Sequence, residues 1–364
     1  MEKTDFGKNS FDILRLYGVI YIITTYILSR VLPVEMPSVV TWWNGVTVMF
    51  CMSGFLVGAS VERSESIREF LKKRALRVLP LMWVCIIITT LTAGLLCGFT
   101  ADKTFWIWLT GQLCFIRDLP QPDFIANFAS GVFMEGLWTM VHIAQFYIIT
   151  ALIYKLLKNR GIKVWTIVLA VSMVFNLLAP YLEQILPETG GLIVRNSFLK
   201  LFYVYFAGWF MYRWRDIILP VLTRTKILCV LLLIARGIYC AKTGACVGAY
   251  QDMIIVLLLC MLTVGAGYSF GRIKVKIDLS YGLFLYSVVA VDIFVQLGLT
   301  GNIAYVILVY AVSALCAAAS YFLVDGTVKR IFKSTADMKY SDVEIQEAEA
   351  EEAVVVHGAE ESDF

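Results

Sequence analysis

The chain has 364 residues, of which 59% are hydrophobic and 16% are charged, and its mean hydropathy is +0.76. Soluble domains carry about 25% charged residues, so this composition excludes a soluble globular protein and indicates an integral membrane protein. The net charge of +3 says little about partners, because the charges are segregated along the chain. No nucleic-acid partner is predicted.

Ten apolar runs are long enough to cross a bilayer, which takes about 20 helical residues. The first begins at about Phe11, behind mixed polar residues, and is predicted to remain as a helix rather than to be cleaved as a signal peptide. The predicted fold class is therefore all-α, a polytopic membrane protein with about ten transmembrane helices. The predicted spans are about 11–32, 43–60, 78–98, 137–157, 164–180, 197–212, 226–241, 252–269, 279–297 and 303–324.

The basic residues alternate between the two sides of the predicted spans. With the N-terminus in the cytoplasm, the cytoplasmic segments collect 24 of the 31 basic residues and the outer segments only seven. Cytoplasmic loops carry such an excess of Lys and Arg. Both termini are therefore predicted to be cytoplasmic.

A strongly basic helix is predicted at residues 66–77, between the second and third spans, after a break of small residues at Ser53-Gly54. Its apolar side chains fall at helical spacing and can lie in the membrane interface. Its cationic groups, which fall within about two turns, can hold the phosphates of a ligand or serve only to keep this loop cytoplasmic. They are Arg68, Lys72, Lys73, Arg74 and Arg77.

Two further segments fall outside the predicted spans. Residues 99–136 form a long outer segment with an aromatic piece at 105–108, interfacial or re-entrant, and a turn-rich piece at 118–123. Structureless loops of this length are uncommon, so this one either shapes an outer-face site or lid or has no ligand. From residue 334 the chain is acidic, which predicts a transmembrane domain at 1–333 and a disordered cytoplasmic tail at 334–364.

Nine cysteines lie mostly inside the apolar runs, where a thiol behaves as a small hydrophobe. Their spacing indicates no metal site. Cys97 with Cys114, or Cys240 with Cys246, could form a disulfide if their loops face an oxidising compartment.

Polar groups inside membrane spans are costly and by default mark a functional site. Arg15 and Tyr26 are eleven residues apart, about three turns and roughly 16 Å along one helical face, so they could line one passage. His142, the one histidine in the spanning region, could serve as a general base, although a structural hydrogen bond is the alternative. Interhelical hydrogen bonding is also the alternative for Ser53, Tyr281 and Ser287. The carboxylates Asp292 and Asp325 are further candidates.

Six segments, in chain order, resemble acyltransferase family 3, a family of multi-pass membrane acyltransferases. The resemblance covers nearly the whole spanning region. Its elements are Phe11-Asp12-Ile13-Leu14-Arg15-Leu16, Met52-Ser53-Gly54-Phe55-Leu56, the basic helix through Arg74, Arg77, Pro80 and Trp83, Leu137-Trp138-Thr139 with Gln145-Phe146-Tyr147, Ser280-Tyr281-Gly282-Leu283-Phe284-Leu285, and Tyr321-Phe322-Leu323-Val324-Asp325.

The resemblance implies transfer of an acetyl or other acyl group from a cytoplasmic coenzyme A thioester, with acyl-CoA as the donor and no metal. The implied acceptor is a hydroxyl of a cell-surface polysaccharide or lipid-linked glycan at a bacterial cytoplasmic (inner) membrane. It implies contact with membrane lipid, and polysaccharide-synthesis proteins as possible partners. Arg74 and Arg77 would hold the donor phosphates, with Arg15 and Ser53 also on the donor side.

Three positions depart from the family pattern. The histidine expected eleven residues after Arg15 is Tyr26, the carboxylate expected five residues after Trp138 is Ile143, and the histidine expected after the Ser-Tyr element is Ser287. Because tyrosine has a pKa of about 10, the usual general base is missing. The candidate catalytic residues are then Tyr26 and His142, and the resemblance implies an acyltransferase with an atypical active site. Two alternative functions remain: a non-catalytic family member that exports glycan or lipid, and a non-catalytic member that assists a polysaccharide-synthesis enzyme.

Overall fold

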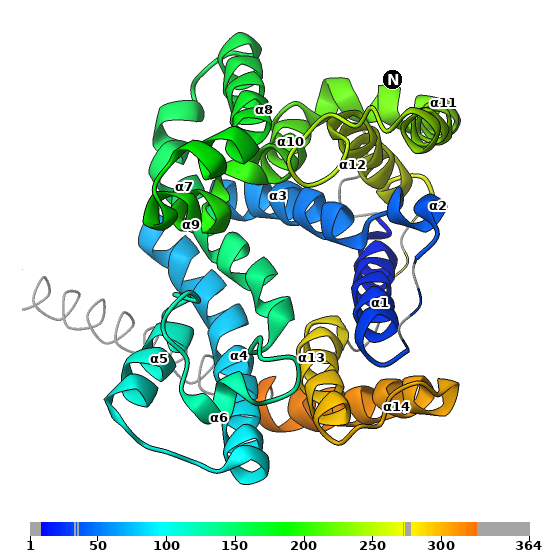
Figure 1. Cartoon of the computed structure of the whole chain (residues 1–364). Coiled ribbons are helices and arrows are strands. Elements are labelled where there is room, and N and C mark those ends of the chain that lie inside the picture. The colour runs from blue at the N-terminus through cyan, green and yellow to red at the C-terminus, as the bar shows by residue number, and fades with distance from the viewer. Residues whose placement is uncertain (1–8, 33, 35, 272, 274–277, 326–364) are drawn as a thin grey trace, which may run out of the picture. The chain divides into compact units, whose positions relative to one another are not determined.

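The computed structural model describes residues 9–325, apart from 33, 35, 272 and 274–277, with side chains described as far as Leu323. Within these ranges every regular element is a helix, which confirms the all-α fold class (Figure 1). The elements are α1 (Phe11–Arg30), α2 (Ser38–Thr41), α3 (Gly45–Arg63), α4 (Ile67–Cys97), α5 (Lys103–Leu113), α6 (Asp123–Ala126), η1 (Glu135–Leu137), α7 (Trp138–Leu157), α8 (Ile162–Ile185), α9 (Glu188–Asn196), η2 (Phe198–Lys200), α10 (Phe202–Arg213), α11 (Arg215–Thr243), α12 (Met253–Gly267), α13 (Ser280–Gln296), α14 (Ile303–Ser320) and η3 (Tyr321–Asp325).

Among the described residues, seven stretches of helix are long and apolar enough to cross a membrane: those containing α1, α3, α4, α7, α8, α11 and α14. Two more apolar helices, α12 and α13, are shorter, with 15 and 17 residues, and α10 has 12. Each of the ten predicted spans coincides with one of these ten helices. The protein is therefore a polytopic membrane protein.

The chain divides into two compact units, Met1–Ala317 and Ala318–Phe364, and all contacts and cavities described below belong to the first. In the second unit the structure describes only the end of α14 and the π-helical turn η3. The predicted boundary at residue 334 and the acidic tail lie outside the described residues. Asp325, a predicted site residue, lies outside the described side chains.

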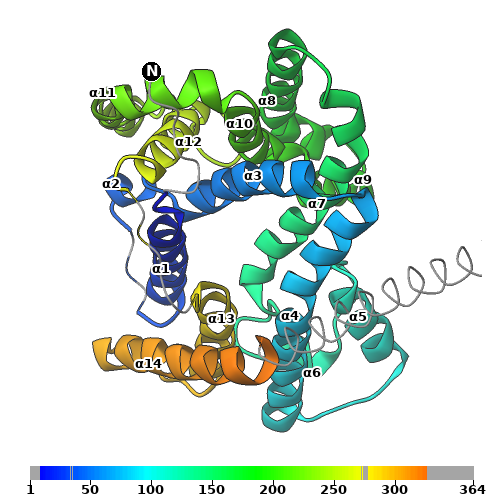
Figure 2. The same cartoon turned by 180° about the vertical axis from the view of Figure 1, so that it is seen from behind.

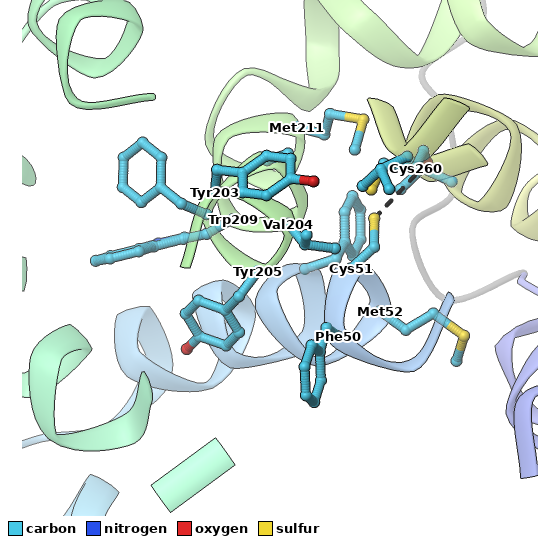
Figure 3. Close-up of a cluster of buried hydrophobic side chains, with 14 of the residues drawn as sticks. Phe50, Cys51, Met52, Tyr203, Val204, Tyr205, Trp209, Met211 and Cys260 are labelled. Carbon is cyan, nitrogen blue, oxygen red and sulfur yellow. Dashed lines mark hydrogen bonds between the residues drawn. The ribbon is translucent and has the colours of Figure 1, made fainter. Parts of the chain in front are cut away.

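One hydrophobic core forms where α3 crosses α10, and it extends to α7, α8, α11 and α12. Figure 3 shows its centre, where side chains of α3 meet those of α10, and Cys51 Sγ approaches the backbone oxygen of Cys260 at 3.7 Å. The close crossing requires glycine, because a Cβ at Gly54 would lie 1.8 Å from Tyr205 O and one at Gly208 would lie 1.9 Å from Cys51 O. Small residues permit such approaches between membrane helices.

A second hydrophobic core joins α1, α4, α13 and α14 with the outer segment. Figures 1 and 2 show α1 between α3 on one side and α13 on the other, and α1 contacts both helices. Helix α4 contacts α7 and α13. The five helices α1, α3, α4, α7 and α13 therefore meet where the two cores adjoin.

Two local expectations differ from the structure. The small-residue break at Ser53-Gly54 does not interrupt α3, which runs unbroken to Arg63, because its glycine serves the crossing with α10 rather than a turn. The basic helix is not separate from the third span: α4 is continuous from Ile67 to Cys97, with Pro80 inside it. The helix begins at Ser66, whose hydroxyl accepts a hydrogen bond from the Glu69 N–H at 3.1 Å, as N-cap residues do.

The outer segment is folded rather than extended. It contains α5, α6 and η1, and the aromatic piece predicted at 105–108 lies in α5, with Trp108 fully buried and Trp106 exposed. Phe115, Ala129 and Met134 have positive φ angles of 65°, 53° and 41°. Such left-handed backbone conformations are uncommon for residues other than glycine. The segment ends at Glu135 and Gly136, which line a cavity described below.

Candidate active site

The inner cavity includes the parts of α1, α4 and α13 that the predicted topology places toward the cytoplasm, where Arg15, Arg77 and Ser280 lie. It has a volume of about 130 Å³ and is lined by residues of α1, α3, α4, α7 and α13. All four predicted donor-side residues line it, together with Tyr281, whose hydroxyl donates to Val78 O at 2.8 Å. Its polar lining residues are Arg15, Ser53, Arg74, Arg77, Thr139, Tyr147, Ser280 and Tyr281.

Three arginines concentrate positive charge at the inner cavity. Arg15 pairs with Asp278 and also with Asp12, at 3.4 Å. Arg74 lies 5.7 Å from the centroid of the Tyr147 ring, and its Nε is buried with no hydrogen-bond partner among the described residues. Arg77 lies within electrostatic range of Arg15 and Arg74.

Neither Arg74 nor Arg77 is in an ion pair within the part of the chain that the structure describes. The cluster therefore keeps positive charge and N–H donors for an anionic ligand, and guanidinium groups are well suited to phosphate.

Asp278, between α12 and α13, is held ionised by this cluster. Partial burial opposes its ionisation, but the charge of Arg15, hydrogen bonds with Ser280 and the charge of Arg77 more than offset that effect. The pKa of Asp278 therefore falls below its usual value, and its carboxylate neutralises Arg15 more than the other two arginines.

The outer cavity adjoins the inner one, because Ile22, Val46 and Phe284 line both. Its volume is about 460 Å³, and it includes two predicted site residues, Tyr26 and Ser287. Ser287 Oγ donates to Phe284 O at 2.7 Å. Aromatic rings, hydroxyls, an amide and charged groups make up its polar and aromatic lining: Tyr21, Thr25, Tyr26, Ser29, Arg30, Asn44, Glu135, Trp138, Tyr250, Phe284 and Ser287.

Tyr26 is tied to a buried carboxylate. Its hydroxyl donates to Asp292 Oδ1 at 2.9 Å, and Asp292, on α13, is only 2% exposed. One turn along α1, Arg30 pairs with Glu135 at 2.5 Å. The outer cavity therefore combines a tyrosine with a buried carboxylate behind it and an ion pair beside it.

His142 lines neither cavity, although its ring packs against Trp138, which lines the outer one. It is buried in α7, and its Nδ1 lies 2.8 Å from Trp138 O. Its Nε2 is buried with no hydrogen-bond partner among the described residues, and the charged group of Lys200 lies within electrostatic range. Neither cavity includes it among the lining residues, so the structure does not bring His142 together with the arginines or with Tyr26.

Sequence reasoning assigned no role to Asp278, Arg30 or Glu135, and it named Asp292 only as one of the polar groups inside the predicted spans. Asp292 was a candidate because it is a carboxylate inside the predicted span 279–297. Its partner, 266 residues earlier in the chain, was not visible without the packing of α1 on α13.

Cys240, Cys246 and Asp252 have potential metal-ligand atoms within 4.8 Å of one another. Both carboxylate oxygens of Asp252 already accept hydrogen bonds from Arg236, at 3.1 and 2.7 Å, and Asp252 Oδ1 also caps α12 by accepting from the Ile255 N–H. A guanidinium in contact with this carboxylate opposes a second cation there.

The chain is similar to known proteins over much of its length. Residues 38–322 match the family model described as acyltransferase domain. Nodulation protein 10 of Rhizobium leguminosarum bv. viciae is 24% identical over 325 residues, which cover 81% of this chain and 86% of that protein. An O-acetyl transferase of Shigella phage Sf6 is 29% identical over 142 residues, 38% of this chain and 42% of that protein. No solved structure matches the chain significantly. Because the family model spans well over half of its residues, the chain belongs to acyltransferase family 3.

Proposed function

We propose that this protein transfers an acetyl or other acyl group from cytoplasmic acyl-CoA to a hydroxyl of a cell-surface polysaccharide or lipid-linked glycan, at a bacterial cytoplasmic membrane. The observation that carries the proposal is the pair of adjoining cavities. Arg15, Arg74 and Arg77 line one, and Tyr26 lines the other. This arrangement can hold an anionic donor at one end and a polar acceptor at the other.

The charge of the inner cavity supports an anionic donor. Coenzyme A is anionic at its phosphates and carries its thioester on a slim, nearly neutral arm. The phosphates would contact Arg74 and Arg77, which lack ion-pair partners among the described residues. The arm would follow the apolar lining toward Val46 and Phe284, which are shared with the outer cavity.

The acceptor fits the outer cavity. Sugars present hydroxyls to hydrogen-bonding groups and C–H faces to aromatic rings. The outer cavity offers both, with Trp138 and Tyr250 among its rings and Asn44 and Glu135 among its polar groups. The O-acetyl transferase of the phage, a relative over 142 residues, supports a hydroxyl as the acceptor.

The reaction joins the acceptor oxygen to the acyl carbon and breaks the carbon–sulfur bond. The electron pair leaves with sulfur, and the proton lost by the acceptor hydroxyl ends on the coenzyme A thiol. The protein has to bring the two substrates together and to move that proton. Positioning of this kind can supply about 7–11 kcal/mol of the barrier.

The test is incorporation of radiolabel from acetyl-CoA into the lipid and glycan fractions of membranes that contain the protein. We expect label above that of membranes from cells lacking the gene. Absence of label, with the protein present and acetyl-CoA bound, would contradict transfer. That result would favour a non-catalytic member that acts in glycan export or assists a polysaccharide-synthesis enzyme.

A further inference from the structure

We infer that Tyr26 and Asp292 form a proton relay, in which Tyr26 takes the proton of the acceptor hydroxyl and passes its own to Asp292. The inference rests on the proposed function, and it names the groups that move the proton. Tyr26 is the catalytic residue because it lines the outer cavity. Asp292 acts through it as a positioning and proton-accepting residue.

The geometry of the pair suits a relay. The Tyr26 hydroxyl donates to Asp292 Oδ1 at 2.9 Å, which leaves the lone pairs of that hydroxyl for a hydrogen bond from a group in the cavity. Asp292 itself does not line the cavity and is 2% exposed. The carboxylate therefore reaches the acceptor only through the tyrosine.

Tyrosine alone is a poor general base at neutral pH, because a phenol ionises with a pKa of about 10. A relay avoids the free phenolate: the phenol oxygen gains one proton while it loses another to the carboxylate. The hydrogen bond that Tyr26 already makes is the path that the second proton would follow.

The groups that surround Asp292 leave its carboxylate available to accept a proton. From α1 it faces Tyr26 and Arg30, and from the outer segment it faces Glu135 and the peptide N–H of Met134. Arg30 pairs with Glu135, and Asp292 has no ion pair within the described ranges. Its second oxygen, Oδ2, is buried without a hydrogen bond of good geometry to any described residue. A carboxylate serving only as an interhelical tie would be expected to satisfy both oxygens.

The proton balance closes with the groups named. The acceptor oxygen attacks the acyl carbon while its proton moves to Tyr26 Oη and the Tyr26 proton moves to Asp292 Oδ1. The coenzyme A thiolate then leaves, and the proton returns from Asp292 through Tyr26 to the outgoing sulfur. Both residues end as they began.

Two substitutions separate the relay from a structural tie. Asp292→Asn keeps the shape and an oxygen that accepts the Tyr26 hydrogen bond, but an amide does not take up a proton at neutral pH. Tyr26→Phe keeps the ring and removes the hydroxyl. We expect each to lower the rate of label transfer from acetyl-CoA by about 10²–10⁴-fold. Acetyl-CoA binding and thermal stability should stay near those of the wild type.

Asp292→Glu should restore measurable transfer with a displaced pH profile, since it returns a carboxylate with a longer stem. The control is Tyr17→Phe, on the same helix, because Tyr17 bonds Trp43 O and lines neither cavity. Should Asp292→Asn fail to accumulate, Tyr26→Phe carries the same test. If the wild type transfers label and both Asp292→Asn and Tyr26→Phe transfer it at the same rate, the relay is overturned and the proposed function is not. A wild type that binds acetyl-CoA but transfers no label would overturn the proposed function, and the relay with it.

Discussion

At the scale of single residues, Arg74 and Arg77 are the side chains on which donor binding depends most. Arg15 is partly neutralised by Asp12 and Asp278, whereas neither of the other two has an ion pair among the described residues. The charge available to a phosphate is therefore mainly theirs. Orientation alone would need only basic residues somewhere in this segment.

Replacing Arg74 and Arg77 together by Gln should weaken acetyl-CoA binding, because each charge-assisted phosphate contact contributes about 1.5–3 kcal/mol. The matched control is the double substitution of Arg68 and Lys73 by Gln, which removes equal charge outside the inner cavity. Isothermal titration of purified protein measures both. Equal affinities for the two double variants would leave orientation as the role of Arg74 and Arg77.

Replacing His142 distinguishes two accounts of the proton acceptor. The sequence offers His142, the one histidine of the spanning region, as a candidate base. A relocated general base predicts about a 10²–10⁴-fold loss of transfer in His142→Ala. The relay predicts a change of no more than a few fold, since His142 lines neither cavity. The initial rate of label transfer decides between them, and the larger loss would contradict the relay.

At the scale of elements, the crossing of α3 and α10 fixes the position of the wall that carries Ser53. Gly54 and Gly208 allow this contact, since a Cβ on either would lie less than 2 Å from a backbone oxygen of the facing helix. The same helix α3 contributes Met49, Phe50 and Ser53 to the inner cavity. Separation of the two helices would therefore disturb the donor side of the site.

Gly54→Ala should lower the stability of the protein in detergent by about 1–3 kcal/mol or more, as overpacking of a tight core does. Gly161→Ala is the control, because a Cβ at Gly161 meets nothing within 4 Å and its φ of −71° suits any residue. Thermal unfolding of the two purified variants tests this. Similar melting temperatures would mean that the helices separate without cost.

The helices themselves could be predicted from the sequence because long apolar runs in a bilayer must satisfy their backbone internally. The closeness of Arg74 and Arg77 could also be predicted, since basic residues three positions apart in one helix cluster whatever the tertiary fold. The Tyr26–Asp292 pair could not, because it depends on how α1 and α13 pack. Nor could the continuity of α4, where the change from basic to apolar residues at Val78 predicted the start of a separate span.

At the scale of the whole molecule, α1 carries an ion pair at each end. Arg15 pairs with Asp278 and Arg30 pairs with Glu135, and the predicted topology puts the first pair on the cytoplasmic side and the second on the outer side. The inner and outer cavities lie at the corresponding ends. The proposed reaction therefore needs the donor on one side of the membrane and the acceptor on the other.

Reporter fusions test this arrangement at loops that the structure defines. A reporter inserted after Ser64 or Gly161 should read cytoplasmic, and one inserted near Pro120 or Gly298 should read external. The reason is that an odd number of predicted spans separates each site of the first pair from each site of the second. Insertion sites within α4 are avoided because that helix is continuous. A cytoplasmic signal at Pro120 would reverse the side on which the arginines meet the donor.

The central claim is that an acyl group passes from a cytoplasmic thioester, through adjoining cavities, to an acceptor on the outer side. The most direct measurement uses sealed inverted vesicles, whose cytoplasmic face is outward, supplied with radiolabelled acetyl-CoA. We predict that label reaches lipid or glycan enclosed in the vesicles and that substitution of Arg74 and Arg77 by Gln removes most of it. Transfer that is equal in right-side-out vesicles of matched integrity, or absent from inverted ones, would contradict the account.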